Sequence, residues 1–215
     1  MEYHKIQSVY MRDPATKFKS FLVGQWATPE IEYLADNEWE FDEKVDGTNI
    51  RVMFMNPALL GICTVRFGGR TDDAQIPAYL YARLQELFPI DKIAEIFPDC
   101  ENVILYGEGY GAKIQKGGGD YKPDGVDFIL FDVRVGNFWL RRGAVEDVAA
   151  KLSLNTTPRM GFGTLHTAIE MCREGFASKL RKTPPEGLIC RPVVPLFARN
   201  GDRVITKVKL KDFSQ

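Results

Sequence analysis

The chain has 215 residues, of which 45% are hydrophobic and 27% are charged, and its formal net charge at pH 7 is −1. This composition is ordinary for a globular protein, and the near-zero charge excludes a surface that attracts nucleic acid as a whole, so any polyanion has to be held by a local patch. The sequence has no apolar run near 18 residues and no apolar segment behind its first five residues. We therefore expect neither a transmembrane helix nor a secretory signal. The four cysteines form no Cys-x-x-Cys pair and the two histidines lie far apart, which argues against structural zinc and a histidine triad.

Residues 1–38 are typical of loops and short elements, punctuated by Pro14 and Pro29. Basic and aromatic side chains occur together at residues 10–12 and 17–19. This grouping fits either contact with a nucleic acid or a solvated, partly packed segment, and we favour the second interpretation.

The next stretch, residues 43–49, lies between two strand-like runs at 39–42 and 50–54 that alternate apolar and polar residues. The pair Asp46-Gly47 predicts a tight turn between them. Lys44 is then held at the end of a strand, where it can serve as a nucleophile or a phosphate ligand. An ordinary β-hairpin with exposed charges explains the same residues.

After this stretch, a strand at 65–67 ends in a Gly-Gly loop that projects Arg70, which could bind phosphate or ribose oxygens or simply lie at the surface. Residues 76–97 have the apolar spacing of a helix that Pro89 interrupts, and we assign them to the core. The strand-like run from residue 103 leads into Gly107-Glu108-Gly109, where the glycines leave the carboxylate open to a ligand. The basic, glycine-rich segment 113–122 that follows fits either a lid or a mobile surface loop.

A further strand is predicted at 127–135, with a hairpin turn at Gly136-Asn137. Phe128 and Phe131 are three residues apart and should face opposite sides, so that one packs in the core and the other can meet a ligand. Helices are predicted at 145–152 and 165–176.

Two more strands complete the chain, at 186–191 and 204–211. The first opens on Glu186-Gly187. On the second, Lys207, Lys209 and Lys211 fall on one face, where they repel one another unless an anion lies between them; an exposed edge strand protected by lysines is the alternative. Many strands with inserted helices predict an α+β fold with antiparallel sheets flanked by helices.

These motifs follow one another in a fixed order: Lys44-Val45-Asp46-Gly47, Arg70, Tyr106-Gly107-Glu108-Gly109, Asp127-Phe128 to Phe131-Asp132, Glu186-Gly187 and Lys207-Val208-Lys209. The order resembles that of the covalent nucleotidyltransferase superfamily of DNA ligases, RNA ligases and capping enzymes. Within it, Glu-Lys-x-Asp-Gly-Thr-Asn is most similar to the RNA ligases related to phage T4 RNA ligase 2. The resemblance implies an ATP-grasp-like ligase fold.

The resemblance also implies a role for each motif residue. Lys44 would attack the α-phosphate of ATP, while Lys207 and Lys209 would hold that phosphate and favour the neutral form of the nucleophile. Glu186 would bind Mg²⁺ or Mn²⁺. The remaining residues would hold the nucleotide or orient the active loop: Glu43 and its backbone at the adenine amino edge, Asp46 and Asn49 on the loop, Glu108 at the ribose hydroxyls, Arg70 at the ribose or phosphate, Phe128 on one face of the adenine, and Ile189 or Leu188 on the other.

The implied activity is an ATP-dependent RNA ligase that forms lysyl-AMP, adenylates a 5′-phosphate end and seals it to a 3′-hydroxyl. Its partner would be RNA with such ends, such as a nicked duplex, and we expect a cytoplasmic monomer. Superfamily ligases usually carry a further domain after the last lysine motif, whereas this sequence stops at Gln215. The sequence is then either a minimal ligase or a catalytic domain cut from a longer protein. We expect one nucleotidyltransferase domain over residues 1–215, with no separate C-terminal OB or helical domain and with weak, salt-sensitive binding of nucleic acid. The alternatives are a minimal DNA nick ligase, an end-binding module without turnover and a GTP-using capping enzyme.

Overall fold

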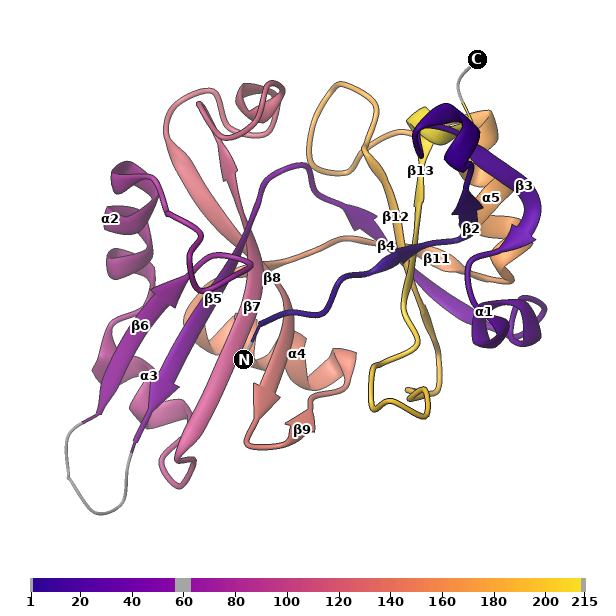
Figure 1. Ribbon diagram of the computed structural model, residues 1–215. Helices are drawn as coiled ribbons and strands as arrows, with labels where there is room; N and C mark the ends of the chain where they lie inside the picture. The colour runs from indigo at the N-terminus through magenta and orange to yellow at the C-terminus, as the bar shows by residue number, and fades with distance from the viewer. Residues whose placement is uncertain (1, 57–62, 214–215) are drawn as a thin grey trace. The chain divides into compact units, whose positions relative to one another are not determined.

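The computed structural model describes residues 2–56 and 63–213 and contains two compact units, each with its own hydrophobic core (Figure 1). Unit 1 comprises Met1–Tyr3 and Asp46–Thr157, and unit 2 comprises His4–Val45 and Pro158–Gln215. The domain expected over residues 1–215 includes residues 1, 57–62 and 214–215, which lie outside the described part. No helix in the described ranges combines the length and the hydropathy that crossing a bilayer requires.

Unit 1 is built on a six-stranded sheet in the order β10-β8-β7-β5-β6, with β9 added beside β8. Its strands are β5 (Thr48–Met55), β6 (Thr64–Gly68), β7 (Asn102–Gly111), β8 (Val126–Val135), β9 (Phe138–Trp139) and β10 (Asn155–Thr156). Every neighbouring pair is antiparallel except β10 and β8. The predicted hairpin at Gly136-Asn137 is confirmed, because β9 pairs back onto β8.

Helices pack against one face of this sheet. They are α2 (Ala78–Leu87), α3 (Ile90–Ile96) and α4 (Arg142–Leu152), and a 3₁₀ turn, η2 (Gly118–Asp120), follows β7. Leu80, Leu84 and Ile93 from α2 and α3 are fully buried in one cluster with Ile50 and Val52 of β5. The predicted stripe over residues 76–97 is therefore confirmed, with α2 and α3 separated at Pro89.

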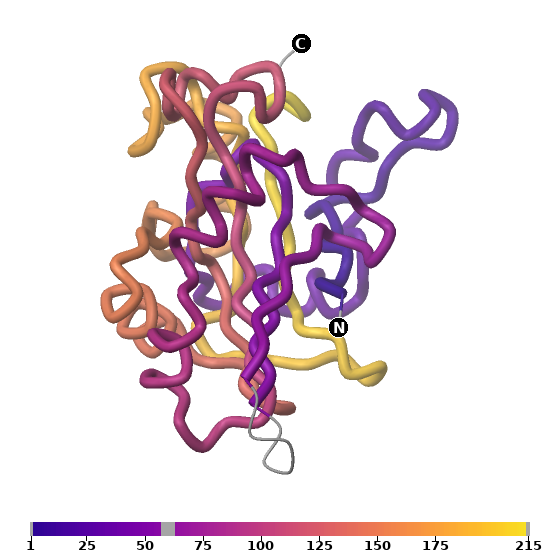
Figure 2. Tube along the Cα trace, turned by 90° about the vertical axis from the view of Figure 1, so that its left-hand side faces the viewer, coloured from indigo at the N-terminus to yellow at the C-terminus, as the bar shows by residue number. Residues whose placement is uncertain are grey.

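Unit 2 has a five-stranded sheet in the order β1-β13-β12-β4-β11 and a separate pair, β2-β3. The strands are β1 (Gln7–Ser8), β2 (Tyr10–Arg12), β3 (Phe21–Trp26), β4 (Trp39–Lys44), β11 (Arg159–Gly163), β12 (Gly187–Pro192) and β13 (Thr206–Lys209). The start of the chain, indigo in Figures 1 and 2, lies beside the yellow C-terminal strand because β1 pairs in parallel with β13.

One face of the unit 2 sheet is covered by α5 (Leu165–Glu174), and the short elements α1 (Pro29–Tyr33), η1 (Pro14–Thr16) and η3 (Leu210–Asp212) complete the unit. Trp39, Phe41 and Leu188 are fully buried in one cluster with residues of α5. Since side chains alternate along a strand, Lys44 and Lys209 project from the opposite face. The sheet thus has an apolar face against α5 and a charged face away from it.

The α+β class with predominantly antiparallel sheets is confirmed, but two expectations about strands are wrong. The runs on either side of Asp46-Gly47 form no hairpin, since β4 pairs with β11 and β12 whereas β5 pairs with β6 and β7. The last strand ends at Lys209, and Lys211 lies in η3. In both cases a local pattern indicated extended backbone correctly but could not identify the partner or the end of the strand.

Candidate active site

Lys44 is the last residue of β4, as expected, and lies in a row of paired residues across three strands of unit 2. Gly187 of β12 lies opposite Lys44 on one side and opposite Lys209 of β13 on the other. A Cβ atom at Gly187 would lie 2.0 Å from the carbonyl oxygen of Val208, so only glycine fits between the two lysine strands. The missing side chain also leaves the space between the two lysines open.

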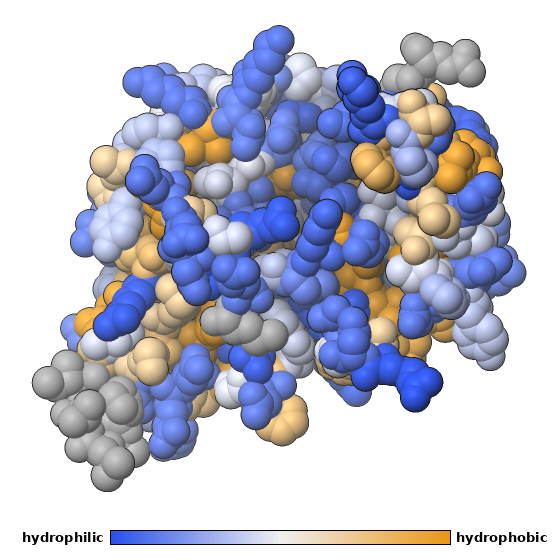
Figure 3. Space-filling view, in the orientation of Figure 1, coloured by the Kyte–Doolittle hydropathy of each residue, from blue (hydrophilic) through white to orange (hydrophobic). Residues whose placement is uncertain are grey.

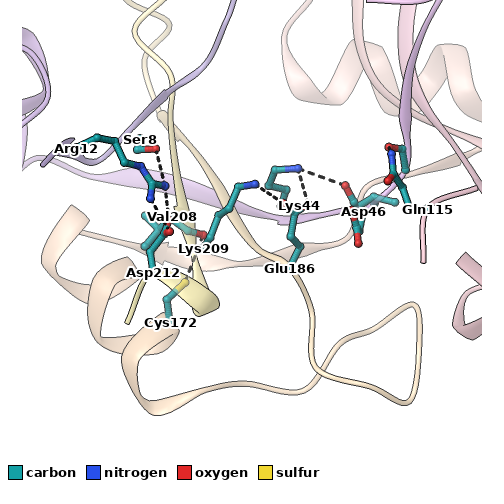
Figure 4. A network of polar contacts seen from close by, with 12 residues as sticks. Ser8, Arg12, Lys44, Asp46, Gln115, Cys172, Glu186, Val208, Lys209 and Asp212 are labelled. Atoms are coloured by element: carbon teal, nitrogen blue, oxygen red, sulfur yellow. Dashed lines mark hydrogen bonds and ion pairs between the residues drawn. The ribbon is translucent and has the colours of Figure 1, made fainter. Parts of the chain in front are cut away.

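Glu186 occupies that space from the residue before Gly187. Its Oε2 accepts a hydrogen bond from Lys44 Nζ at 2.6 Å, and its Oε1 lies 2.5 Å from Lys209 Nζ. Figure 4 shows the carboxylate between the ends of the two lysine side chains. All three side chains are only 15–21% exposed, so these ion pairs are shielded from solvent. The structure therefore brings together three residues that are separated in sequence, and we call them the lysine–carboxylate centre.

The charges of this centre change the pKa values of two groups. Burial alone would raise the pKa of Glu186, but the positive charges of Lys44 and Lys209 outweigh it and hold that pKa below its usual value. At Lys207, burial and neighbouring charges act in the same direction. Partial burial, together with the positive charges of Lys209 and Lys44, lowers the pKa of Lys207 to about 8. The nearest ionic partner of Lys44 is thus a carboxylate, and Lys207 is close enough to Lys44 and Lys209 for their charges to affect its pKa.

Two further predicted residues of unit 2 lie on different faces of the sheet. Ile189 pairs with Lys207 and is partly exposed on the charged face, which is compatible with a ligand contact. Glu43 is adjacent to Lys44 and so points the other way. Its side chain is fully buried and accepts hydrogen bonds from Ser178 Oγ and from the backbone N–H of Lys179, at 2.8 Å for the latter. In this structure the Glu43 carboxylate holds the segment after α5, and the reading of the adenine amino edge by Glu43 and its backbone stays a prediction.

The other predicted residues belong to unit 1. Asn49 of β5 and Glu108 of β7 lie directly opposite each other in the sheet. A Cβ atom at Gly47 would come within 2.7 Å of the Glu108 side chain, so the glycine of the loop permits this close approach. Asn49 Oδ1 is buried without a hydrogen-bond partner among the described residues, which leaves an acceptor for a ligand. The backbone N–H of Asp46 donates to the hydroxyl oxygen of Tyr121 at 3.0 Å.

Arg70 is exposed near the start of the loop that follows β6, and no hydrogen bond or ion pair of its side chain is found within the described ranges. The same loop is held on both sides of Arg70 by Arg51, a fully buried side chain that donates to the carbonyl oxygen of Gly69 at 2.6 Å and pairs with Asp72 at 2.8 Å. Sequence reasoning missed Arg51, although an arginine inside an otherwise apolar strand is a signal for a buried partner.

The two phenylalanines of β8 face opposite sides of the sheet, as predicted. Phe128 is 2% exposed and packs edge-on against Phe88 in the core, with ring centroids 5.2 Å apart. Phe131 lies at a register shift in the β7–β8 pairing and packs 5.2 Å from Tyr3 on the other face. Phe128 therefore shows no free ring face to a base in this structure. Its stacking role stays a prediction, and that role requires the ring to leave its core packing.

The donor set limits which metal could bind. Among the residues that the structure describes, no three His, Cys, Asp or Glu side chains gather into a metal site. Magnesium is often held by one or two carboxylates together with water and substrate phosphates. Glu186 alone, next to cations that attract phosphate, fits a metal that arrives with a nucleotide and not one held by a protein cage.

Sequence reasoning also missed the N-terminal segment, which lies beside the lysine strand. Arg12 of β2 forms a two-pronged ion pair with Asp212, with N–O distances of 2.8 and 2.7 Å (Figure 4). The pair joins residues 200 positions apart. No local pattern indicates such a partner, so only the folded structure could reveal it.

Comparison with known proteins supports this arrangement of motifs. The sequence profile of the family described as RNA ligase matches residues 37–209, which span parts of both units and every predicted site residue. A search of curated proteins gives no significant match.

Among solved structures, the chain is similar to RNA ligase from Naegleria gruberi. A mutant with ATP and Mn aligns with a TM-score of 0.67 and 18% sequence identity over 97% of this chain. A mutant without ligand aligns with a TM-score of 0.68 and 17% identity over 99% of it. This chain spans 56% of the length of either structure. At this level of identity, the likeness establishes the fold.

Proposed function

The chain belongs to the RNA ligase family, and we propose that it is an ATP-dependent RNA ligase with Lys44 as its nucleophile. One observation carries the proposal: Lys44 Nζ and Lys209 Nζ lie 2.6 and 2.5 Å from the two oxygens of one carboxylate, on the face of the sheet away from the core. Such a centre holds a reactive amine in a fixed place and keeps a second cation ready for a phosphate.

The proposed reaction has three displacements at phosphorus. The lone pair of neutral Lys44 Nζ attacks the α-phosphorus of ATP, pyrophosphate leaves, and the amine loses a proton to give lysyl-AMP. An oxygen of the RNA 5′-phosphate then attacks the same phosphorus, so that the P–N bond breaks and the amine regains a proton. Finally, the RNA 3′-hydroxyl attacks the 5′-phosphate, loses its proton and expels AMP.

The surrounding charges suit these steps. Negative charge builds on the phosphate oxygens in each displacement, and Lys209 and Lys207 can stabilise it from fixed positions. Glu186 Oε2 lies 2.6 Å from the amine and holds it in place before the nucleotide binds. Lys207 titrates close to neutral pH, since its pKa is lowered to about 8.

ATP and a divalent metal, Mg²⁺ or Mn²⁺, are the proposed cofactors, and the Naegleria structures with ATP and Mn support both. Glu186 would hold the metal together with phosphate oxygens, and the metal would neutralise phosphate charge. Nucleotide contacts by Asp46, Asn49, Arg70 and Glu108 remain predictions from the resemblance.

We further propose that residues 1–215 act as one adenylation domain, which the family match across both units supports. Its substrates would be RNA ends that carry a 5′-phosphate and a 3′-hydroxyl. We propose that it acts as a cytoplasmic monomer.

Intact-mass measurement after incubation with ATP and Mg²⁺ tests the proposal. We expect the wild type to gain the mass of one AMP and Lys44→Ala to gain none. Lys44→Arg keeps the positive charge beside Glu186 but lacks the nucleophilic amine, so it should fold and remain unlabelled. Lys151→Ala, in the exposed pair with Asp147, serves as the matched control. Labelled Lys44→Ala protein would refute the assignment of the nucleophile.

Two further comparisons separate the proposal from its rivals. Labelling with GTP in place of ATP would indicate a capping enzyme. Incubation of labelled protein with nicked duplexes that end in a ribose or a deoxyribose 3′-hydroxyl should give sealing of the ribose end. Sealing of deoxyribose ends alone would indicate a DNA ligase, and labelled protein that seals neither would leave only the first step of the proposal.

A further inference from the structure

Unit 2 contains an open cavity of about 720 Å³ beside the lysine strand. Its walls come from the start of the chain, from the loop between β2 and β3, and from β13 with η3. Six basic side chains line it: Lys5, Arg12, Lys19, Lys207, Lys209 and Lys211. Asp212 is the single acidic residue in the lining. All of these residues belong to one unit, so the cavity is formed within unit 2 alone.

The charges in this cavity are only partly neutralised. Arg12 forms an ion pair with Asp212, and Lys209 forms one with Glu186. The side chains of the other four lysines have no ion pair or hydrogen bond among the described residues. Such a cluster of unpaired positive charges is destabilised by mutual repulsion. An anion in the cavity would relieve it.

The remaining walls suit a nucleic acid strand. Phe18 and Met11 both line the cavity, and they are 63% and 47% exposed. Phe18 has a φ of +61°, and the preceding Lys17 has a φ of +56°, a strained local backbone that presents the ring to solvent. Aromatic rings beside a basic groove are the combination that binds single strands, because phosphates contact the cations while a base stacks on the ring.

Neither the net charge of −1 nor the overall surface favours such a partner. Hydrophilic side chains predominate on the face drawn in Figure 3, and apolar ones form separate patches. Binding of a polyanion therefore has to come from a local concentration of positive charge, and this cavity provides one next to the proposed catalytic lysines.

We propose that this cavity binds the phosphate backbone of the RNA strand that is to be joined, with Lys5, Lys19, Lys207 and Lys211 as phosphate contacts and Phe18 as the base-stacking side chain. The inference rests on the proposed function in that RNA is the substrate. It adds a strand-binding site that is distinct from the nucleophile and that is built largely by the N-terminal segment.

Fluorescence anisotropy with a labelled, 5′-phosphorylated single-stranded RNA tests the site without ATP or metal. We expect the triple variant Lys5→Ala, Lys19→Ala, Lys211→Ala to bind at least tenfold more weakly than the wild type near physiological salt. Each phosphate contact on a single strand contributes about −0.7 to the slope of log K against log salt. Loss of three contacts should therefore make the slope less steep by about 2. Phe18→Ala should weaken binding about fivefold or more with the slope unchanged, since it removes stacking and no charge.

The control variant Lys92→Ala, Lys151→Ala, Arg199→Ala also removes three positive charges, but from surfaces outside the cavity. It should retain the RNA affinity and the salt slope of the wild type. Equal losses in both triple variants would overturn the proposal, because bulk charge would then explain them. Unchanged RNA affinity in the cavity variant would also overturn it. If that variant kept its RNA affinity but lost AMP labelling, the cavity would serve the triphosphate instead. Absence of labelling in the wild type would refute the proposed function alone, because the RNA measurement uses no ATP.

Discussion

Replacing Glu186 by glutamine tests the lysine–carboxylate centre directly. The change keeps the shape of the side chain but removes the charge that Lys44 and Lys209 share at 2.6 and 2.5 Å. Loss of one partner of a fully buried pair costs about 3–5 kcal/mol, whereas exposed pairs contribute under about 1 kcal/mol. The three side chains are 15–21% exposed. We therefore expect Glu186→Gln to lower the free energy of unfolding by about 2 kcal/mol at pH 7.

The pH dependence of this loss follows from the pKa of Glu186, which the two lysines hold below its usual value. A carboxyl group with a lowered pKa in the folded state stabilises the fold above its unfolded pKa of about 4.3. That stability is lost as the pH falls through the lower, folded value. The difference between wild type and Glu186→Gln should thus be fully present at pH 7 and should shrink at acid pH.

Urea unfolding of both proteins at pH 7 and at about pH 3 measures this difference. Asp147→Asn is the matched control, because it breaks an exposed ion pair to Lys151 on one turn of α4 and should cost only about 0.3–0.5 kcal/mol. A difference between wild type and Glu186→Gln that persists unchanged at acid pH would refute the reasoning, since it would reflect packing and not charge. So would a loss at pH 7 no larger than that of the control.

Three further outcomes are expected. Gly187→Ala should destabilise the fold by about 2 kcal/mol or more and abolish AMP labelling, because its Cβ would lie 2.0 Å from the carbonyl oxygen of Val208. Gly161 has nearly the same φ but lies in open space, so Gly161→Ala should lower the free energy of unfolding much less in urea. Lys207 has a lowered pKa of about 8, so the unfolded chain binds more protons between pH 8 and about 10.4 and wild-type stability should rise there. Solvation of the amine limits the rise to about 1–2 kcal/mol, and Lys207→Met should lack it. Glu43→Ala should lower the free energy of unfolding by about 1–3 kcal/mol, because it leaves the two donors at Ser178 and Lys179 unpaired. Proteolysis should then cut the segment around Ser178 faster. An unchanged rate of cutting would contradict the role of Glu43 in holding this segment.

Local patterns were enough to predict the separate helices and strands and the order of the motifs. The apolar stripes of α2, α4 and α5 and the alternation in β4, β8 and β12 can be read from spacing, because helices and strands repeat with fixed periods. The position of Lys44 at a strand end and the glycines around Glu108 follow from the same local rules. The opposite orientations of Glu43 and Lys44 were also implied by this alternation, although the motif resemblance suggested a shared ligand.

Which strands pair and which charges meet could be learned only from the folded chain. The two strands beside Asp46-Gly47 look like a hairpin, yet they enter different sheets, because strand pairing depends on partners far away in the chain. Partners far away in the chain also determine the position of Glu186 between Lys44 and Lys209 and the ion pair of Arg12 with Asp212. They likewise form the basic cavity, to which the N-terminal segment contributes two lysines and one arginine. A sequence fixes which groups a chain carries and the period with which they recur, but distances between remote groups are set by the packing of the whole unit.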